Sequence, residues 1–172
     1  MKILPVFYWR KSMKLIEVIG SIDALKKNQI EDDTKRKWIS DLESLIIREI
    51  ILTHEMPEWV KDKEAINRYL ETDGKEDVYG ADTEGNAVLL AEPPYDDVYF
   101  WYLAAKIDLA EGDMERYQND HQMYNNAYLT FQDYYNRTYM PVQKVYGFMR
   151  GSACGTRRER NVSAGDETNR PK

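Results

Sequence analysis

The sequence predicts an all-α fold: a bundle of about four helices with one β-hairpin or extended-loop insertion and a flexible C-terminal tail. Three observations carry this prediction. Apolar residues recur at spacings of three and four over most of the chain before Pro141, which is the period of an amphipathic helix. The pattern breaks between residues 76 and 91, where turn formers separate short β-prone runs. Beyond Pro141 the chain is rich in glycine, serine and charge, and such a composition does not build a core.

The first helix is expected within residues 13–28, because the apolar residues of this segment fall on one helical face. Asn28 and Gln29 follow as residues that can end the helix. The expected core face consists of Leu15, Val18, Ile19, Ile22 and Leu25.

The second helix is expected to start at Asp32 or Asp33 and to run to about Thr53. Acidic residues at a helix entry cap the free N–H groups and interact favourably with the helix dipole. Pro57 prevents the helix from continuing. The expected core face holds Trp38, Leu42, Leu45, Ile46 and Ile50, and the expected solvent face holds Lys35, Lys37, Asp41 and Arg48.

A short third helix is expected from Lys63 to Leu70, with Ala65, Ile66 and Leu70 facing inward. The helical pattern then stops. Residues 76–91 are predicted to form a small β-hairpin or an extended loop, since turn formers separate two β-prone runs. The turn formers are Gly80, Asp82 and Gly85, and the runs are residues 78–79 and 87–90.

The strongest pattern predicts an αα-hairpin made of residues 95–110 and 113–139. The first of these helices is apolar on nearly every face, so it is central in the fold or covered by a second surface such as another subunit. Gly112 suits the position after the first helix, and Asp113 suits the N-cap of the next. The second helix carries a heptad stripe of Met114, Tyr117, His121, Tyr124, Tyr128, Phe131 and Tyr135.

Three segments are therefore expected: residues 1–12, a helical domain over 13–141, and a basic tail over 142–172. Two interpretations of residues 1–12 stay open. They form an N-terminal arm, or they precede a true start at Met13, because Trp9-Arg10-Lys11 can be encoded by a sequence that contains a ribosome-binding site. The tail is expected to be flexible and to dock on a partner, with a spectator role as the alternative.

Charge and composition exclude several function classes. The net charge is −6, and residues 150–172 hold six basic against three acidic residues, so the preceding body carries −9. An acidic body does not favour tight nucleic-acid binding, which needs clustered lysine and arginine. The single cysteine, Cys154, excludes an internal disulfide. No apolar run approaches the roughly 18 residues of a membrane span, so no membrane association is predicted.

The chain offers few groups for catalysis or metal binding. It has two histidines, His54 and His121, and lacks the HExxH and CxxC motifs of zinc sites. Five carboxylates lie near the predicted hairpin, and capping and dipole effects account for those at the helix starts. These are Asp96, Asp97, Asp108, Asp113 and Glu115. No catalytic, cofactor-binding or metal-binding residue is therefore predicted, and the chain is not expected to be an enzyme.

Two long stretches of this sequence are distinctive. The first is IDALKKNQIEDDTKRKWISDLESLIIREIILTHE, and the second is PPYDDVYFWYLAAKIDLAEGDMERYQND, followed after two residues by MYNNAYLTFQDYYNRTYMP. They resemble the head–tail connector (adaptor) proteins of tailed bacteriophages and prophages. The resemblance covers roughly residues 13–141. The segment before Met13 matches nothing expected of the family, and the tail after Pro141 is longer and more polar than is typical of it.

The resemblance implies a structural virion protein of the neck, assembled in the cytoplasm of the bacterial host. Such connectors form a homo-oligomeric ring, commonly of twelve copies, below the portal protein. They extend the DNA channel, through which DNA passes without specific binding, and they give the next neck or tail component a docking surface. No cofactor is implied.

Two groups of residues are candidates for these contacts. The subunit or portal interface is expected to use Tyr95, Asp96, Tyr99, Arg137, Tyr139, Tyr146, Phe148, Arg157, Arg158 and Arg160. The channel lining or a neighbour contact is expected to use Glu76, Asp77, Asp82 and Glu84. The alternative function is a cytosolic helical protein-binding module without enzymatic activity, and an enzyme with a carboxylate site outside known motifs is a third reading.

Overall fold

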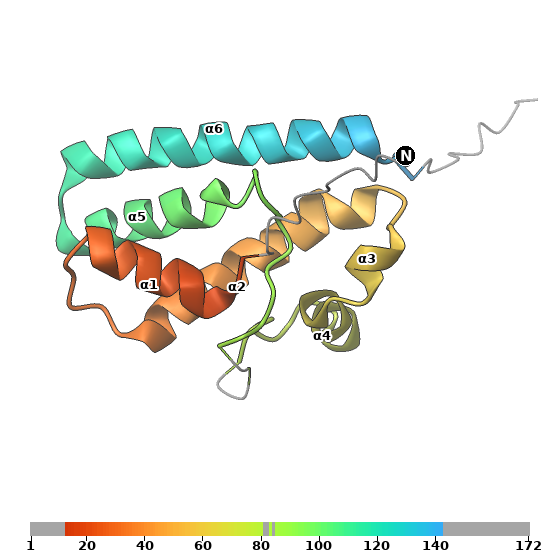
Figure 1. Cartoon of the computed structure of the whole chain (residues 1–172), viewed down its shortest axis with the longest axis horizontal. Helices are drawn as coiled ribbons and strands as arrows, with labels where there is room; N and C mark the ends of the chain where they lie inside the picture. Colours follow the sequence, from red (N-terminus) through yellow and green to blue (C-terminus); the bar gives the residue numbers. More distant parts are fainter. Residues whose placement is uncertain (1–12, 81–82, 84, 143–172) are drawn as a thin grey trace, which may run out of the picture. The chain divides into compact units, whose positions relative to one another are not determined.

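The computed structural model describes residues 13–80, 83 and 85–142 (Figure 1). These residues belong to the first of two units in the chain, Met1–Val142. Within the described residues there are six α-helices, one 3₁₀ helix and no strand, which confirms the all-α class. The helices are α1 (Leu15–Leu25), α2 (Asp32–Glu49), η1 (Ile51–Thr53), α3 (Glu58–Lys61), α4 (Glu64–Thr72), α5 (Asp97–Glu111) and α6 (Met114–Thr138).

Helix α5 is the central layer of this unit. The longer α6 runs antiparallel along one side of α5, while α1 and α2 pack against its other side (Figure 1). Residues on several faces of α5 are therefore buried, among them Val98, Leu103, Ala104 and Ile107. This arrangement explains why the sequence of α5 is apolar all round, because a helix covered from both sides has no face reserved for water.

The turn between α5 and α6 uses the two residues that the sequence indicated. Gly112 adopts φ +80°, a left-handed conformation that glycine takes without the Cβ penalty of other residues. The Asp113 carboxylate accepts a hydrogen bond from the Arg116 N–H at 3.1 Å and so caps α6. The predicted αα-hairpin is confirmed.

The heptad stripe of α6 is confirmed only in part. Tyr124, Phe131 and Tyr135 are buried against the body, whereas Met114 at the start of the helix is 52% exposed. The Tyr124 ring lies 5.1 Å from the ring of Tyr102 on α5. The stripe therefore packs along α5, but Met114, its first residue, stays exposed to solvent.

Two predictions about the leading helices are wrong in detail. Leu25 is 73% exposed instead of being in the core, because α1 ends there and the chain turns away. Lys35 is buried, although it was assigned to the solvent face. Its ammonium group lies 2.6 Å from the Asp23 carboxylate and 3.5 Å from that of Asp32, and these partners make burial of the charge tolerable.

The predicted β-hairpin at residues 76–91 is wrong, and the described part of this segment is an extended loop. Several of its backbone groups pair with other parts of the chain, and within the segment the Thr83 N–H donates to the Gly80 carbonyl. The N–H of Leu15 donates to the carbonyl of Ala87, the N–H of Leu89 donates to that of Met13, and the Tyr79 N–H donates to the Ser40 hydroxyl. The β-prone side chains are apolar enough to be buried individually, so no strand ladder is needed.

The far end of the unit contains an element that the sequence did not indicate, the four-residue helix α3. Helix α4 forms close to its expected position, but Leu70 is 53% exposed where a core position was predicted. Residues 140–142, which follow α6, pair with residues 53–55 through two backbone hydrogen bonds. The N–H of Glu55 donates to Met140, and that of Val142 donates to Thr53.

None of the helices in the described ranges combines the length and the apolar character needed to cross a bilayer.

Candidate functional site

The most informative surface feature is a groove between the start of α5 and the middle of α6, which we call the α5–α6 groove. Its volume is about 220 Å³. It is lined by Pro94, Tyr95, Asp97 and Trp101 on one side and by Met123, Asn126, Ala127 and Thr130 on the other. Apart from one carboxylate, its walls are aromatic, aliphatic, amide and hydroxyl groups.

Aromatic contacts hold the walls of the groove in place. The Tyr95 ring stacks on Tyr134 with centroids 4.4 Å apart, and it also contacts Phe131 at 6.2 Å. Phe100 and Trp101 also meet edge to face, with ring centroids 5.2 Å apart. Rings fixed by their neighbours lose little entropy when a partner covers them, which is a property of good protein-contact surfaces.

A smaller pocket of about 130 Å³ lies further along the same two helices. Tyr102, Tyr117, His121 and Tyr124 form most of its wall, and the Lys106 ammonium lies 5.3 Å from the Tyr102 ring centre. Burial, assisted by the field of Asp41, raises the pKa of Tyr102 to about 12, so this phenol stays protonated at neutral pH. The rings pack against one another and the lysine covers them, which accounts for this pocket as helix packing.

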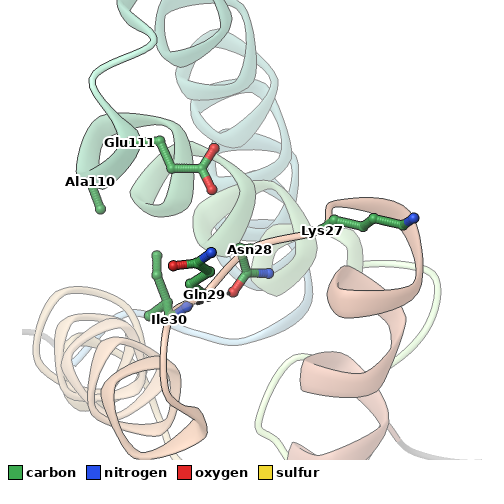
Figure 2. A pocket seen from close by; sticks show the side chains of 6 residues that line it. All are labelled: Lys27, Asn28, Gln29, Ile30, Ala110 and Glu111. Carbon is green, nitrogen blue, oxygen red and sulfur yellow. Dashed lines mark hydrogen bonds between the residues drawn. The ribbon is translucent and has the colours of Figure 1, made fainter.

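The third depression, of about 500 Å³, lies between the α1–α2 connection and the end of α5 (Figure 2). Residues 27–30 form one side, and Ala110 and Glu111 form the other. Figure 2 shows side chains of mixed polarity around it, with no converging set of acids and bases. It offers no arrangement suited to general acid–base chemistry.

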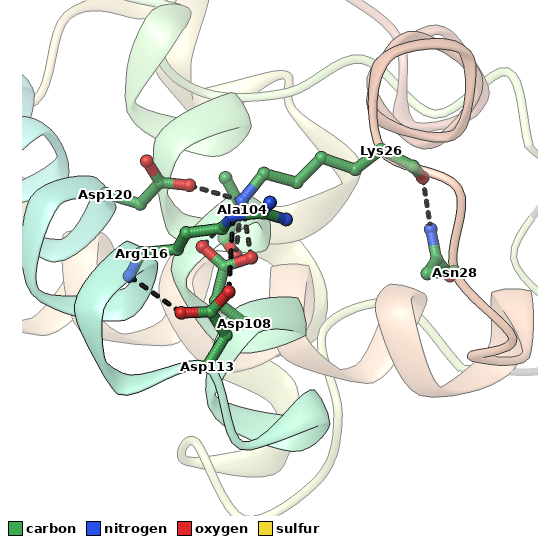
Figure 3. Close-up of polar contacts among 7 residues, drawn as sticks. All are labelled: Lys26, Asn28, Ala104, Asp108, Asp113, Arg116 and Asp120. Carbon is green, nitrogen blue, oxygen red and sulfur yellow. Dashed lines mark hydrogen bonds and ion pairs between the residues drawn. The ribbon is translucent and has the colours of Figure 1, made fainter.

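An ion cluster joins α1 to the α5–α6 hairpin (Figure 3). The Lys26 ammonium binds both carboxylate oxygens of Asp108, at 2.7 and 2.6 Å, and one oxygen of Asp120 at 2.5 Å. Burial alone would lower the pKa of Lys26, but the two carboxylates outweigh it and raise that pKa above its usual value. Burial and the nearby Asp120 raise the pKa of Asp108 against the opposing effect of Lys26. The cluster fastens elements together and has no open position for a substrate.

Glu43 on α2 is a fully buried titratable group. Its Oε1 accepts hydrogen bonds from the Leu90 N–H at 3.0 Å and from the Tyr99 hydroxyl. Burial is the main cause that raises the pKa of Glu43 to about 7. Sequence analysis missed this group, although a signal was present: Glu43 lies in helical register with the buried Ile39, Ile46 and Ile50.

Some of the predicted interface residues lie in the described part of the chain, and the others lie outside it. Tyr95 lines the groove, Asp96 is the N-cap residue of α5, and Arg137 is exposed in the last turn of α6. Tyr139 is half-buried, and its hydroxyl accepts a hydrogen bond from the Trp59 indole at 3.0 Å. The remaining residues Tyr146, Phe148, Arg157, Arg158 and Arg160 lie outside the described residues.

Tyr99 requires a correction, because its side chain is fully buried and is not available as a contact surface. Its hydroxyl is instead hydrogen-bonded to Glu43 and to the Ala91 N–H. The reason is the central position of α5, which turns this face of the helix toward α2 and not toward solvent. Of the predicted channel residues, Glu76 and Asp77 are exposed, while Asp82 and Glu84 lie outside the described residues.

No group of three or more histidine, cysteine, aspartate or glutamate side chains in the described part of the chain is placed to hold a metal ion. Comparison with known proteins found no matching family model, curated protein or solved structure. The candidate function therefore depends on the chemistry of the groove and on the sequence motifs that line it.

Proposed function

We propose that the chain is a structural subunit of a phage head–tail connector, and that the α5–α6 groove receives a neighbouring copy in a ring. One observation carries the proposal: the groove is lined by the segments on which the resemblance rests. Pro94, Tyr95 and Asp97 belong to PPYDD, and Met123 and Asn126 belong to MYNNAYLT. The aromatic rings of the groove, Tyr95 and Trp101, are half-buried, and partly exposed rings held by their neighbours are typical of a protein contact.

The charge distribution supports the other half of the proposal, the DNA channel. The body before Arg150 carries −9, and Glu76 and Asp77 are exposed on the loop after α4. Like charge on a channel wall lets DNA slide without sticking. We assign this loop to the channel side or to a neighbouring subunit, with portal and the next neck component as partners above and below.

The proposal is tested by a pair of matched substitutions on α6, Met123→Glu and Leu129→Glu. Met123 lines the groove and is 44% exposed, and Leu129 is 53% exposed but is not a groove residue. Burying an unpaired carboxylate in a protein contact weakens the contact strongly. Each 1.4 kcal/mol of lost binding free energy lowers the affinity about tenfold. Met123→Glu is therefore expected to reduce ring formation and portal binding at least tenfold, and Leu129→Glu to leave both unchanged.

The measurement is size-exclusion chromatography with light scattering, with and without the portal protein of the same phage. Thermal melts monitored by circular dichroism check that both variants fold. Equal behaviour of the two variants would contradict the role of the groove. A wild-type protein that stays a monomer and ignores portal would favour the alternative, a helical module whose groove binds a different protein.

A further inference from the structure

One side chain connects three parts of the unit that are far apart in sequence. Glu43 of α2 accepts hydrogen bonds at Oε1 from the Leu90 N–H, 3.0 Å away, and from the Tyr99 hydroxyl of α5. The same hydroxyl accepts a hydrogen bond from the Ala91 N–H at 2.7 Å. A single carboxyl group thus attaches the end of the long loop, residues 89–91, to two helices of the core.

The surroundings of Glu43 favour its neutral form. The side chain is fully buried, and its Oε2 has no hydrogen-bond partner among the described residues. The hydroxyl of Tyr79, whose electrostatic interaction with Glu43 is unfavourable for charge on both groups, is also buried and has none there. A buried carboxylate with one oxygen unpaired is costly, so ionisation opposes the closed arrangement.

The other charged groups nearby do not form an ion pair with Glu43. Lys63, at the start of α4, lowers the pKa of Glu43 through its field, but its ammonium binds the Leu89 carbonyl at 3.4 Å and the Glu92 carboxylate at 3.3 Å. Glu64 in the first turn of α4 acts in the opposite direction on the adjacent Tyr79. Burial is the largest effect and raises the pKa of Glu43 to about 7, against the hydrogen bonds from the Leu90 N–H and the Tyr99 hydroxyl, which stabilise the ionised form and lower that pKa.

The described residues of the loop beside Glu43 form neither helix nor strand. They are held by the burial of Leu89, Leu90 and Ala91 and by separate hydrogen bonds, those of Leu90 and Ala91 near Glu43 and those of Ala87 and Leu89 with the entry of α1. Local opening of such a segment admits water to the buried group while the helices stay intact. An ionised Glu43 is stabilised by that water.

We propose that Glu43 is a proton-operated latch, which in its neutral form holds residues 87–91 against α2 and α5 and on ionisation releases them. The latch is a property of the single chain and does not depend on ring formation or on portal. It gives residues 87–91 two states, attached and open, whose ratio follows pH.

The direction of the effect follows from linkage. In the open state Glu43 is solvated and titrates near the ordinary value of 4.5, whereas in the closed state its pKa is about 7. The closed state therefore binds the proton more tightly, and opening becomes more favourable as pH rises from about 4.5 to about 7. Above that range both states are ionised, and the opening equilibrium becomes constant.

Hydrogen exchange measured by NMR tests the latch through the amides of Leu90 and Ala91. After correction for the intrinsic pH dependence of exchange, their opening constant in the wild-type protein is expected to rise about tenfold per pH unit below neutrality and then to level off. The total rise should be on the order of 100-fold. Amides inside α6 should not follow this curve, because their opening does not expose Glu43.

Two variants complete the experiment. Glu43→Gln keeps the size of the side chain and removes the titration, so the opening constants of Leu90 and Ala91 should become independent of pH. Glu49→Gln changes an exposed glutamate on the same helix and should behave as the wild type. A flat wild-type profile, or a pH dependence that survives Glu43→Gln, would overturn the proposal. If Glu43→Gln does not fold, the wild-type profile alone decides.

Discussion

At the scale of single residues, buried polar groups determine more of this structure than the apolar pattern suggests. Glu43, Tyr99 and Tyr79 lie together in the core, yet their hydroxyls and carboxyl oxygens are not equally satisfied. The Tyr99 hydroxyl connects Glu43 to the backbone of Ala91, while the Tyr79 hydroxyl has no partner in the described residues. Removing a bonded and an unbonded hydroxyl should therefore have different effects.

Tyr99→Phe should destabilise the protein by about 1–3 kcal/mol, because the Ala91 N–H and the Glu43 carboxyl each lose a partner inside the core. Tyr79→Phe is the matched control, since it removes the same atom from an equally buried ring nearby. Its effect on the free energy of unfolding should stay within about 0.5 kcal/mol. Urea unfolding of both variants measures the difference, and equal losses would show that the Tyr79 hydroxyl has a partner after all.

At the scale of elements, local sequence signals succeeded where both the element and its ends were encoded nearby. The α5–α6 hairpin was predicted almost to its boundaries, because Gly112 and Asp113 mark the turn and the aromatic stripe marks the packing face. The ion cluster between α1 and this hairpin was not predicted. Lys26 lies far from Asp108 and Asp120 in sequence, so no local pattern joins them.

Lys26→Met should cost about 2–4 kcal/mol near neutral pH, because Asp108 is buried and would face Asp120 without a cation between them. Lys27→Met is the control, since Lys27 is the exposed neighbour in the same connection. The loss should shrink as the pH falls, because burial and the nearby Asp120 raise the pKa of Asp108, and protonation of Asp108 removes the repulsion. Denaturant unfolding at several pH values measures this.

An unchanged stability of Lys26→Met at neutral pH would show that solvent screens the cluster. A loss that persists undiminished in acid would instead point to the packing of the lysine stem, a contribution that a methionine should largely preserve.

At the scale of the whole molecule, the sequence predicted the fold class but not how the layers are arranged. The apolar character of α5 left two possibilities open, a central helix or one covered by another subunit, and the structure shows α5 between α6 and the α1–α2 pair. The prediction of a β-hairpin was wrong for a similar reason. Residues 85–89 find their backbone partners at the entry of α1, and pairing over such a sequence distance cannot be read from local β propensity.

The residues of the candidate site were likewise predicted only in part. Tyr95 lines the groove as a half-buried residue, whereas Tyr99, one helical turn further on, is fully buried. Periodicity on an all-apolar helix does not indicate which face is outermost, so only the packed structure distinguishes these two tyrosines. The α6 side of the groove includes Met123, Ala127 and Thr130, which were not among the predicted contacts.

A chain that ends at Thr138 should be less stable than a chain that ends at Val142 by about 1–3 kcal/mol, because the two hydrogen bonds to residues 53–55 and the Tyr139 contacts are lost. Calorimetry on both truncations measures this. Equal stability of the two would mean that residues 139–142 contribute nothing to the body.

The pairing of residues 140–142 with residues 53–55 also determines how the unit responds to mechanical force. A pull on the chain beyond Val142 reaches the Val142–Thr53 hydrogen bond first and the Glu55–Met140 bond next, before it reaches the end of α6. The load therefore passes sideways into the short turn after α2 instead of unwinding α6 from its C-terminal end. An antiparallel pair of this kind serves as a mechanical anchor, so these two hydrogen bonds have to break before tension from beyond Val142 acts on the end of α6.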